Sequence, residues 1–85
     1  MTEIRILGIY VSDRLGAAIN VQAILTKFGC SIKTRLGLHE LTNDLCSTSG
    51  LIILELTGDQ SEAIKLENEL LKLSGVQVKK MVFEK

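Results

Sequence analysis

The chain alternates between apolar segments that fit β-strands and longer amphipathic segments that fit helices. Residues 4–11, IRILGIYV, are rich in β-branched residues and apolar at both even and odd positions. This pattern predicts a strand in the middle of a sheet, with both of its faces covered. Further strands are predicted at 32–41, 51–57 and 76–83, and the polar segment 42–50, TNDLCSTSG, predicts a turn.

The first amphipathic segment predicts a helix between the first two strands. Its apolar residues recur three or four positions apart and so form one stripe, which consists of Ala17, Val21, Ile24 and Phe28 and is widened by Ala18 and Leu25. Ser12 or Asp13 is expected to cap the start of this helix with a side-chain oxygen. Gly29 is expected to follow its last turn.

The second amphipathic segment predicts a helix between the third and fourth strands. Its stripe consists of Ala63, Leu66, Leu70 and Leu73. Asp59, with Glu62 three residues later, is similar to a capping box, and Gly75 is expected to stop the helix.

These elements give the order β-α-β-β-α-β and an α+β, ferredoxin-like fold. Two right-handed βαβ units share one four-stranded antiparallel sheet, with two helices on one face. The alternation within residues 32–41 places Lys33, Arg35 and His39 on the open face. We expect a second subunit to cover that face or an edge of the sheet.

Length, composition and charge narrow the function classes. The 85 residues predict a single domain, 1–85, with 46% hydrophobic and 24% charged residues. Ten basic residues balance ten acidic ones, so direct nucleic-acid binding is not expected. No targeting or membrane-spanning segment is visible, so we expect a cytoplasmic protein with no membrane partner. Cys30 and Cys46 are expected to be ordinary reduced thiols.

The chemistry-bearing residues do not form a catalytic set. His39 is the one histidine, and the sequence has no G-x-S-x-G elbow and no phosphate-binding loop with its lysine. Acylphosphatases share the predicted element order, but SDRLGAA does not supply the first turn with which they cradle phosphate. We therefore expect a non-enzymatic protein without a resident cofactor.

Gly16 raises a question of its own, because glycine in the first turn of a helix reduces helix stability. Either the helix packs tightly on the strand there, or a ligand approaches the backbone. A carboxylate would be favoured by the N–H groups and dipole of a helix start. Asp13 can cap the helix or orient a ligand amine, and Arg14 can be a surface residue or pair with a ligand carboxylate.

The same turn carries a family resemblance. The sequence D-R-L-G at residues 13–16, with Gly29 and Ile32 at the start of the second strand, resembles the ACT domains over the whole element order. In those ligand-sensing domains this glycine lets a small ligand, usually an amino acid, approach at a subunit interface. The resemblance implies a candidate ligand site consisting of Asp13, Arg14, Leu15, Gly16 and Ala17.

A narrower resemblance is to the short single-domain proteins named as iron-only (FeFe) hydrogenase system regulators. It rests on R-x-G at Arg35–Gly37 and on the closing L-x-x-x-x-G-V-x-V-K pattern, with Gly75, Val76, Val78 and Lys79. The resemblance implies a regulatory homo-oligomer, a dimer or tetramer, acting on that system. Because no DNA-binding helix pair is present, any control of transcription is expected to need a regulatory protein partner.

Two alternatives stay open. The nickel-responsive regulators carry an ACT-like domain with H-x-H and then a cysteine six residues on. Here Gly37 takes the place of the first histidine, and His39 and Cys46 are seven residues apart. A metal sensor would therefore have to share His39 and Cys46 between two chains. The third hypothesis is a protein–protein adaptor that binds no ligand.

Overall fold

The computed structural model describes residues 2–12, 16–41 and 46–85, without the side chains of residues 38–41 and 46–49. The elements are β1 (Glu3–Val11), α1 (Ala17–Lys27), the 3₁₀ turn η1 (Gly29–Ser31), β2 (Ile32–Leu41), β3 (Cys46–Leu56), α2 (Gln60–Leu71) and β4 (Val76–Glu84). This order confirms the predicted β-α-β-β-α-β arrangement.

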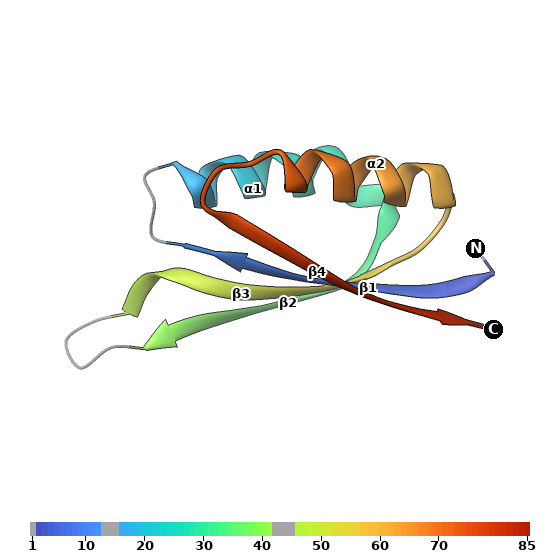
Figure 1. The fold of residues 1–85 in the computed structure, drawn as a ribbon, viewed down its shortest axis with the longest axis horizontal. Helices are drawn as coiled ribbons and strands as arrows, with labels where there is room; N and C mark the ends of the chain where they lie inside the picture. The colour runs from blue at the N-terminus through green and yellow to red at the C-terminus, as the bar shows by residue number, and fades with distance from the viewer. Residues whose placement is uncertain (1, 13–15, 42–45) are drawn as a thin grey trace.

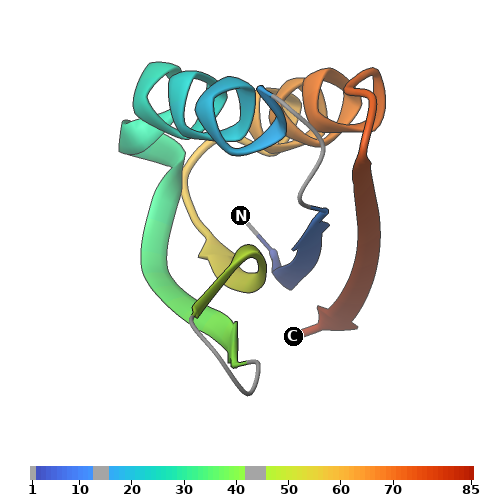
Figure 2. The same cartoon turned by 90° about the vertical axis from the view of Figure 1, so that its left-hand side faces the viewer.

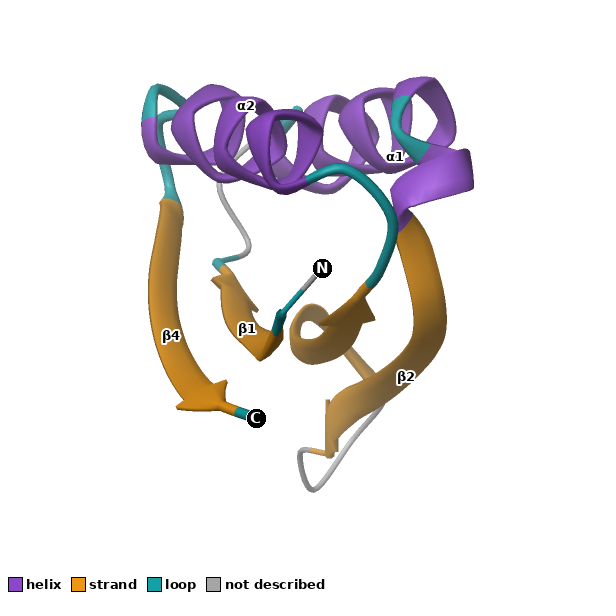
Figure 3. Ribbon diagram, turned by 90° about the vertical axis from the view of Figure 1, so that its right-hand side faces the viewer, coloured by secondary structure: helices purple, strands orange, loops and turns teal. Residues whose placement is uncertain are grey.

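One four-stranded sheet carries both helices on the same face (Figure 1). The strand order is β2-β3-β1-β4, and each neighbouring pair is antiparallel. Strand β1 therefore lies in the interior of the sheet, as its apolar pattern predicted. Figures 2 and 3 show the helices as one layer, and none of the described elements covers the opposite face of the sheet.

The core lies between the sheet and the helix layer. The odd positions of β1 point into it, and they meet the apolar stripes of the two helices. Its members are Leu7, Ile9, Val11, Ala17, Val21, Leu25, Phe28, Leu54, Leu56, Ala63, Leu66 and Leu70. Most residues of both predicted helix stripes, including Leu25, are in the core. The exceptions are Ala18, which is exposed, Ile24, which is partly buried, and Leu73, which is partly buried and lies beyond the end of α2.

The start of α1 differs from the prediction. Gly16 is the N-cap, with φ 84° in the left-handed region, so the predicted cap Ser12 does not occupy this position, and Asp13 lies outside the described residues. A left-handed cap strongly favours glycine, which has no Cβ to clash. At the other end Phe28 is the C-cap, and Gly29 starts η1 with no positive φ.

The start of α2 agrees with the prediction. Asp59 is the N-cap, and its Oδ1 accepts a hydrogen bond from the Ser61 N–H at 2.9 Å. The helix ends at Leu71, before the left-handed Gly75 that precedes β4.

A β-bulge in β2 changes which residues reach the open face. Ile32 pairs with Leu56 and Thr34 with Glu55, so two steps along β2 correspond to one step along β3. Arg35 therefore lies opposite the buried Leu54, on the helix side. Its Nη2 donates to Gln22 Oε1 of α1, and the prediction that Arg35 lies on the open face is wrong.

The same bulge places Leu36 on the open face, where it is 53% exposed, although the alternation had grouped it with Ile32. Lys33 remains on the open side, as predicted, because its Nζ lies 3.7 Å from Glu55 Oε2. Strand β3 also begins at Cys46 instead of residue 51, so the predicted turn is shorter than expected.

Candidate functional site

The predicted ligand site lies where β1 leads into α1. The Ser12 N–H donates to the Gly75 carbonyl at 2.9 Å, which ties the end of β1 to the start of β4. Asp13, Arg14 and Leu15 lie outside the described residues. Of the five candidates, Gly16 caps α1 and Ala17 is buried in the core.

Gly16 is needed for its backbone conformation and not for tight packing within the described part of the chain. A Cβ built on it would have Asn20 Nδ2 as its nearest described neighbour, at 4.0 Å, which is ordinary contact. The Gly16 carbonyl accepts from the Asn20 N–H at 3.0 Å and so closes the first turn of α1. The φ of 84° accounts for the glycine in physical terms.

The two helix starts differ in charge. Asp59 caps α2, and Glu62 lies in its first turn, whereas α1 begins Ala17-Ala-Ile-Asn20 with no acidic residue there. The N-terminal end of a helix carries unpaired N–H groups and a partial positive charge. At the start of α1, the N-cap is a glycine and the first turn holds no carboxylate. The partial positive charge of this helix end is therefore not balanced by an acidic residue of the first turn.

The candidate metal residues lie in neighbouring strands of the β2–β3 hairpin. His39 pairs with Gly50, and Cys46 pairs with Leu41, two residues beyond His39. Their side chains lie outside the part of the chain that the structure describes, so the two-chain metal site stays a prediction. Cys30 is an exposed free thiol in η1.

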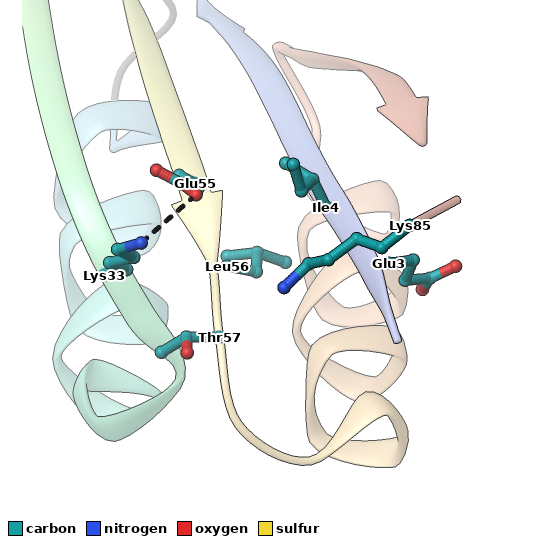
Figure 4. A pocket seen from close by; sticks show the side chains of 7 residues that line it. All are labelled: Glu3, Ile4, Lys33, Glu55, Leu56, Thr57 and Lys85. Carbon is teal, nitrogen blue, oxygen red and sulfur yellow. Dashed lines mark ion pairs between the residues drawn. The ribbon is translucent and has the colours of Figure 1, made fainter. Parts of the chain in front are cut away.

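A cleft of about 250 Å³ opens at the other end of the sheet, where the first residues of β1 separate from the end of β3 (Figure 4). It is lined by Glu3, Ile4, Lys33, Glu55, Leu56, Thr57 and Lys85. Sequence analysis did not foresee it. The Lys33–Glu55 ion pair crosses part of the rim of this cleft, and Glu3 forms an ion pair with Arg5. Most charged side chains of the lining are therefore already paired within the chain.

A buried ionic cluster lies under α2, and the sequence analysis also missed it. Arg5 is 6% exposed. Its Nη2 donates to Glu3 Oε1 at 2.9 Å and its Nη1 to Glu67 Oε1 at 3.1 Å, while Lys80 Nζ lies 3.3 Å from Glu67 Oε2. The available signal was an arginine at an odd position of β1, where the later odd positions 7, 9 and 11 are core residues, with Glu3 two residues before it on the same face.

Comparison with solved structures identifies the family. The uncharacterised protein TM1266 from Thermotoga maritima is 30% identical, with a TM-score of 0.78 over 94% of this chain and 96% of that one. The chain belongs to the TM1266 family. No family model matches the sequence, and no curated protein does.

More distant structures share the fold of this TM1266-family chain. The ACT domain of a GTP pyrophosphokinase from Chlorobium tepidum has a TM-score of 0.63 at 20% identity, over 95% of this chain and 89% of that domain. CPII, a nitrogen regulatory PII-like protein from Thiomonas intermedia bound to ADP, AMP and bicarbonate, has a TM-score of 0.51 at 16% identity, over 98% and 94%. These likenesses confirm the predicted ACT-like, ferredoxin-like fold. Among the described residues, no helix is both long and apolar enough to cross a membrane.

Proposed function

We propose that this chain is a non-enzymatic regulatory module that binds a small ligand at the turn formed by residues 13–17 and acts as a homo-oligomer. Two lines support this: the ACT-like fold, shared with an ACT domain and a PII-like protein, and the absence of a catalytic set from the sequence. The PII-like relative was solved with nucleotides and bicarbonate, which shows that related folds accept small anions.

The observation that carries the proposal is the left-handed glycine cap of α1. Because Gly16 has no side chain, the N–H groups of the first turn receive no capping bond from the N-cap residue itself. A ligand carboxylate at this position would accept those N–H groups and gain from the helix dipole. A free amino acid fits this chemistry, with Asp13 as the candidate partner of its amine.

We also propose that the regulated process is an iron-only hydrogenase system, reached through a protein partner. The support is the motif resemblance at Arg35–Gly37 and at residues 75–79. Deleting the gene is expected to change hydrogenase activity in cell extracts and to leave the purified hydrogenase itself unchanged. Equal activity with and without the gene would contradict this part of the proposal.

Thermal unfolding with free amino acids, nucleotides and divalent metals tests the ligand site. A ligand at 100 times its dissociation constant adds about 2.7 kcal/mol. For a domain of this size that raises the melting temperature by roughly 10 °C or more. We expect one amino acid to produce such a shift and Gly16→Ala to abolish it.

Gly58→Ala is the matched control. Gly58 has φ 82°, close to the 84° of Gly16, and it precedes the other helix. Both substitutions place a Cβ in the left-handed region, at a cost of about 1–2 kcal/mol, so both variants should lose similar stability. Only Gly16→Ala should lose the ligand shift. A shift that survives in Gly16→Ala, or that disappears equally in both variants, contradicts a site at this turn. A metal-dependent shift lost in His39→Ala would favour the metal sensor instead.

A further inference from the structure

The uncovered face of the sheet carries apolar side chains on all four strands, with Glu55, Gln77 and Lys79 among them. The register joins Tyr10 to Leu51, Ile6 to Met81 and Ile4 to Phe83, so these side chains form adjacent rows. Its large exposed side chains are Tyr10, Leu36, Leu51, Met81 and Phe83, which are 36–56% exposed, and the partly buried Ile4, Ile6 and Ile53 lie among them. We call these eight residues the open apolar face.

A group of exposed apolar side chains of this size often marks an interaction site, because water contacts apolar surface at a free-energy cost. Figures 2 and 3 show no described element of the chain on this side of the sheet. We infer that a second copy of the chain covers the open apolar face, so that two sheets pack face to face with the helix layers outside. This deepens the homo-oligomer part of the proposed function and does not depend on its ligand.

The size of the face fits a second copy. Strands of nine residues rise about 3.3 Å per residue, and four strands spaced about 4.8 Å apart make a face of roughly 550 Å². Two copies would bury about 1,100 Å² together, which is above the roughly 1,000 Å² that a biological interface should bury. Two sheets from identical chains also pack naturally about 10 Å apart with interleaved side chains.

The charges around the face favour the same occupant. Lys33 and Glu55 lie at one end of it and are paired with each other, and Lys79 lies on the edge strand β4. The face therefore combines exposed apolar side chains with a few charged ones, Glu55 beside Ile6 and Lys79 beside Gly8, as specific interfaces do. With ten basic and ten acidic residues, two copies carry no net repulsion. Nucleic acid would need several unpaired cations across the face, whereas on its described strand positions Lys79 is the one lysine without an acidic partner.

Sedimentation equilibrium over a wide range of protein concentration tests the inference. The variant carries Leu36→Lys and Phe83→Lys, one substitution on each edge strand of the open apolar face. Both side chains are more than half exposed, so a lysine there can reach water and the fold should survive, which circular dichroism checks. We expect a dimer for the natural chain and a dissociation constant raised about 100-fold or more in the variant, because four lysines meet in one interface.

The matched control carries Ile19→Lys and Leu71→Lys, two exposed apolar residues of the helix layer, 75% and 54% exposed. It should dimerise as the natural chain does. A natural chain that stays monomeric at every concentration overturns the inference. So does a dimer that only the control weakens, since the copies would then meet through their helices. If monomers bind lipid vesicles, the open apolar face contacts a membrane and not a second copy. The ligand proposal survives each of these results, because no ligand is present in the assay.

Discussion

The covered face and the open face of the sheet are both apolar, yet they have different environments. Strand β1 contributes Leu7 and Ile9 to one, where both are fully buried, and Tyr10 to the other, where it is 39% exposed. Two helices cover one side of a four-stranded sheet, and no described residue forms an equivalent layer on the second side. Apolar residues at both even and odd positions of a strand therefore predict two things: an interior position in the sheet, which the structure confirms, and a covering layer on the second face, which we have proposed to be a second copy.

Breaking an ion pair on each face should give the largest difference in the free energy of unfolding. Arg5 bonds Glu3 and Glu67 under α2, where the three side chains are 8–12% exposed. Arg5→Met leaves two buried carboxylates without their main partner and should lower the free energy of unfolding by about 3–5 kcal/mol. Lys33→Met breaks the exposed Lys33–Glu55 pair on the open side and should change the free energy of unfolding by less than about 1 kcal/mol.

Urea unfolding of the two variants measures both values. The exposed pair serves as the control, because each substitution removes one cation and adds the same side chain. Equal losses in Arg5→Met and Lys33→Met would show that burial under α2 does not strengthen the Arg5 cluster. A loss in Arg5→Met that disappears when Glu67 is also replaced by Gln would support the view that uncompensated buried charge is the cause.

Two leucines on one strand give the next largest contrast. Leu54 and Leu51 both belong to β3 and point to opposite faces, opposite Leu7 and Tyr10 of β1. Leu54→Ala removes buried methyl groups from the core and should cost about 2–5 kcal/mol at every protein concentration. Leu51→Ala should cost less than about 1 kcal/mol in dilute protein.

Concentration sharpens this second test. If a second copy covers the open apolar face, the cost of Leu51→Ala measured by thermal unfolding should grow as the protein concentration rises, because unfolding then includes dissociation. The cost of Leu54→Ala should not depend on concentration in the same way. A cost for Leu51→Ala that stays constant would contradict a buried open face.

Sequence analysis predicted the element order, the interior position of β1 and the core stripes of both helices, because these follow from local periodicity. It placed Arg35 and Leu36 on the wrong faces for a physical reason. Apolar residues occur on both sides of this sheet, so alternation in β2 gives the period without saying which face is covered. The bulge after Ile32 then moves each following residue of β2 to the opposite face of the sheet. No residue type in IKTRLG predicts a bulge at this position.

The candidate site was predicted less completely. Gly16 was singled out as unusual for a helix start, and it is the N-cap, but the preference of serine and aspartate for N-caps suggested Ser12 or Asp13 instead of a left-handed glycine. Arg5 was missed because partners for a buried charge come from distant parts of the chain, here Glu67 in α2 and Lys80 in β4. Local patterns describe which residues are apolar, whereas charge burial depends on the tertiary fold.

The smallest expected effect on stability comes from the N-cap of α2, one of the two helices that cover the sheet. The pKa of Asp59 lies below its usual 3.8 because the Ser61 backbone N–H, and then the Ser61 hydroxyl, donate to the ionised carboxylate. A pKa that is lower in the folded state than in the unfolded state means that the carboxylate stabilises the fold above the unfolded value, and that this contribution is lost as the pH falls through the folded value. Asp59→Ala should therefore lower the melting temperature by a few degrees at neutral pH, with the difference from the natural chain shrinking below pH 3.8.

Asp59→Asn keeps an acceptor for Ser61 but does not titrate, so its melting temperature should stay near that of the natural chain at neutral pH and lack this acid-dependent component. If Asp59→Ala and the natural chain differ by the same amount at neutral pH and well below pH 3.8, the ionised cap does not contribute to holding α2 on the covered face.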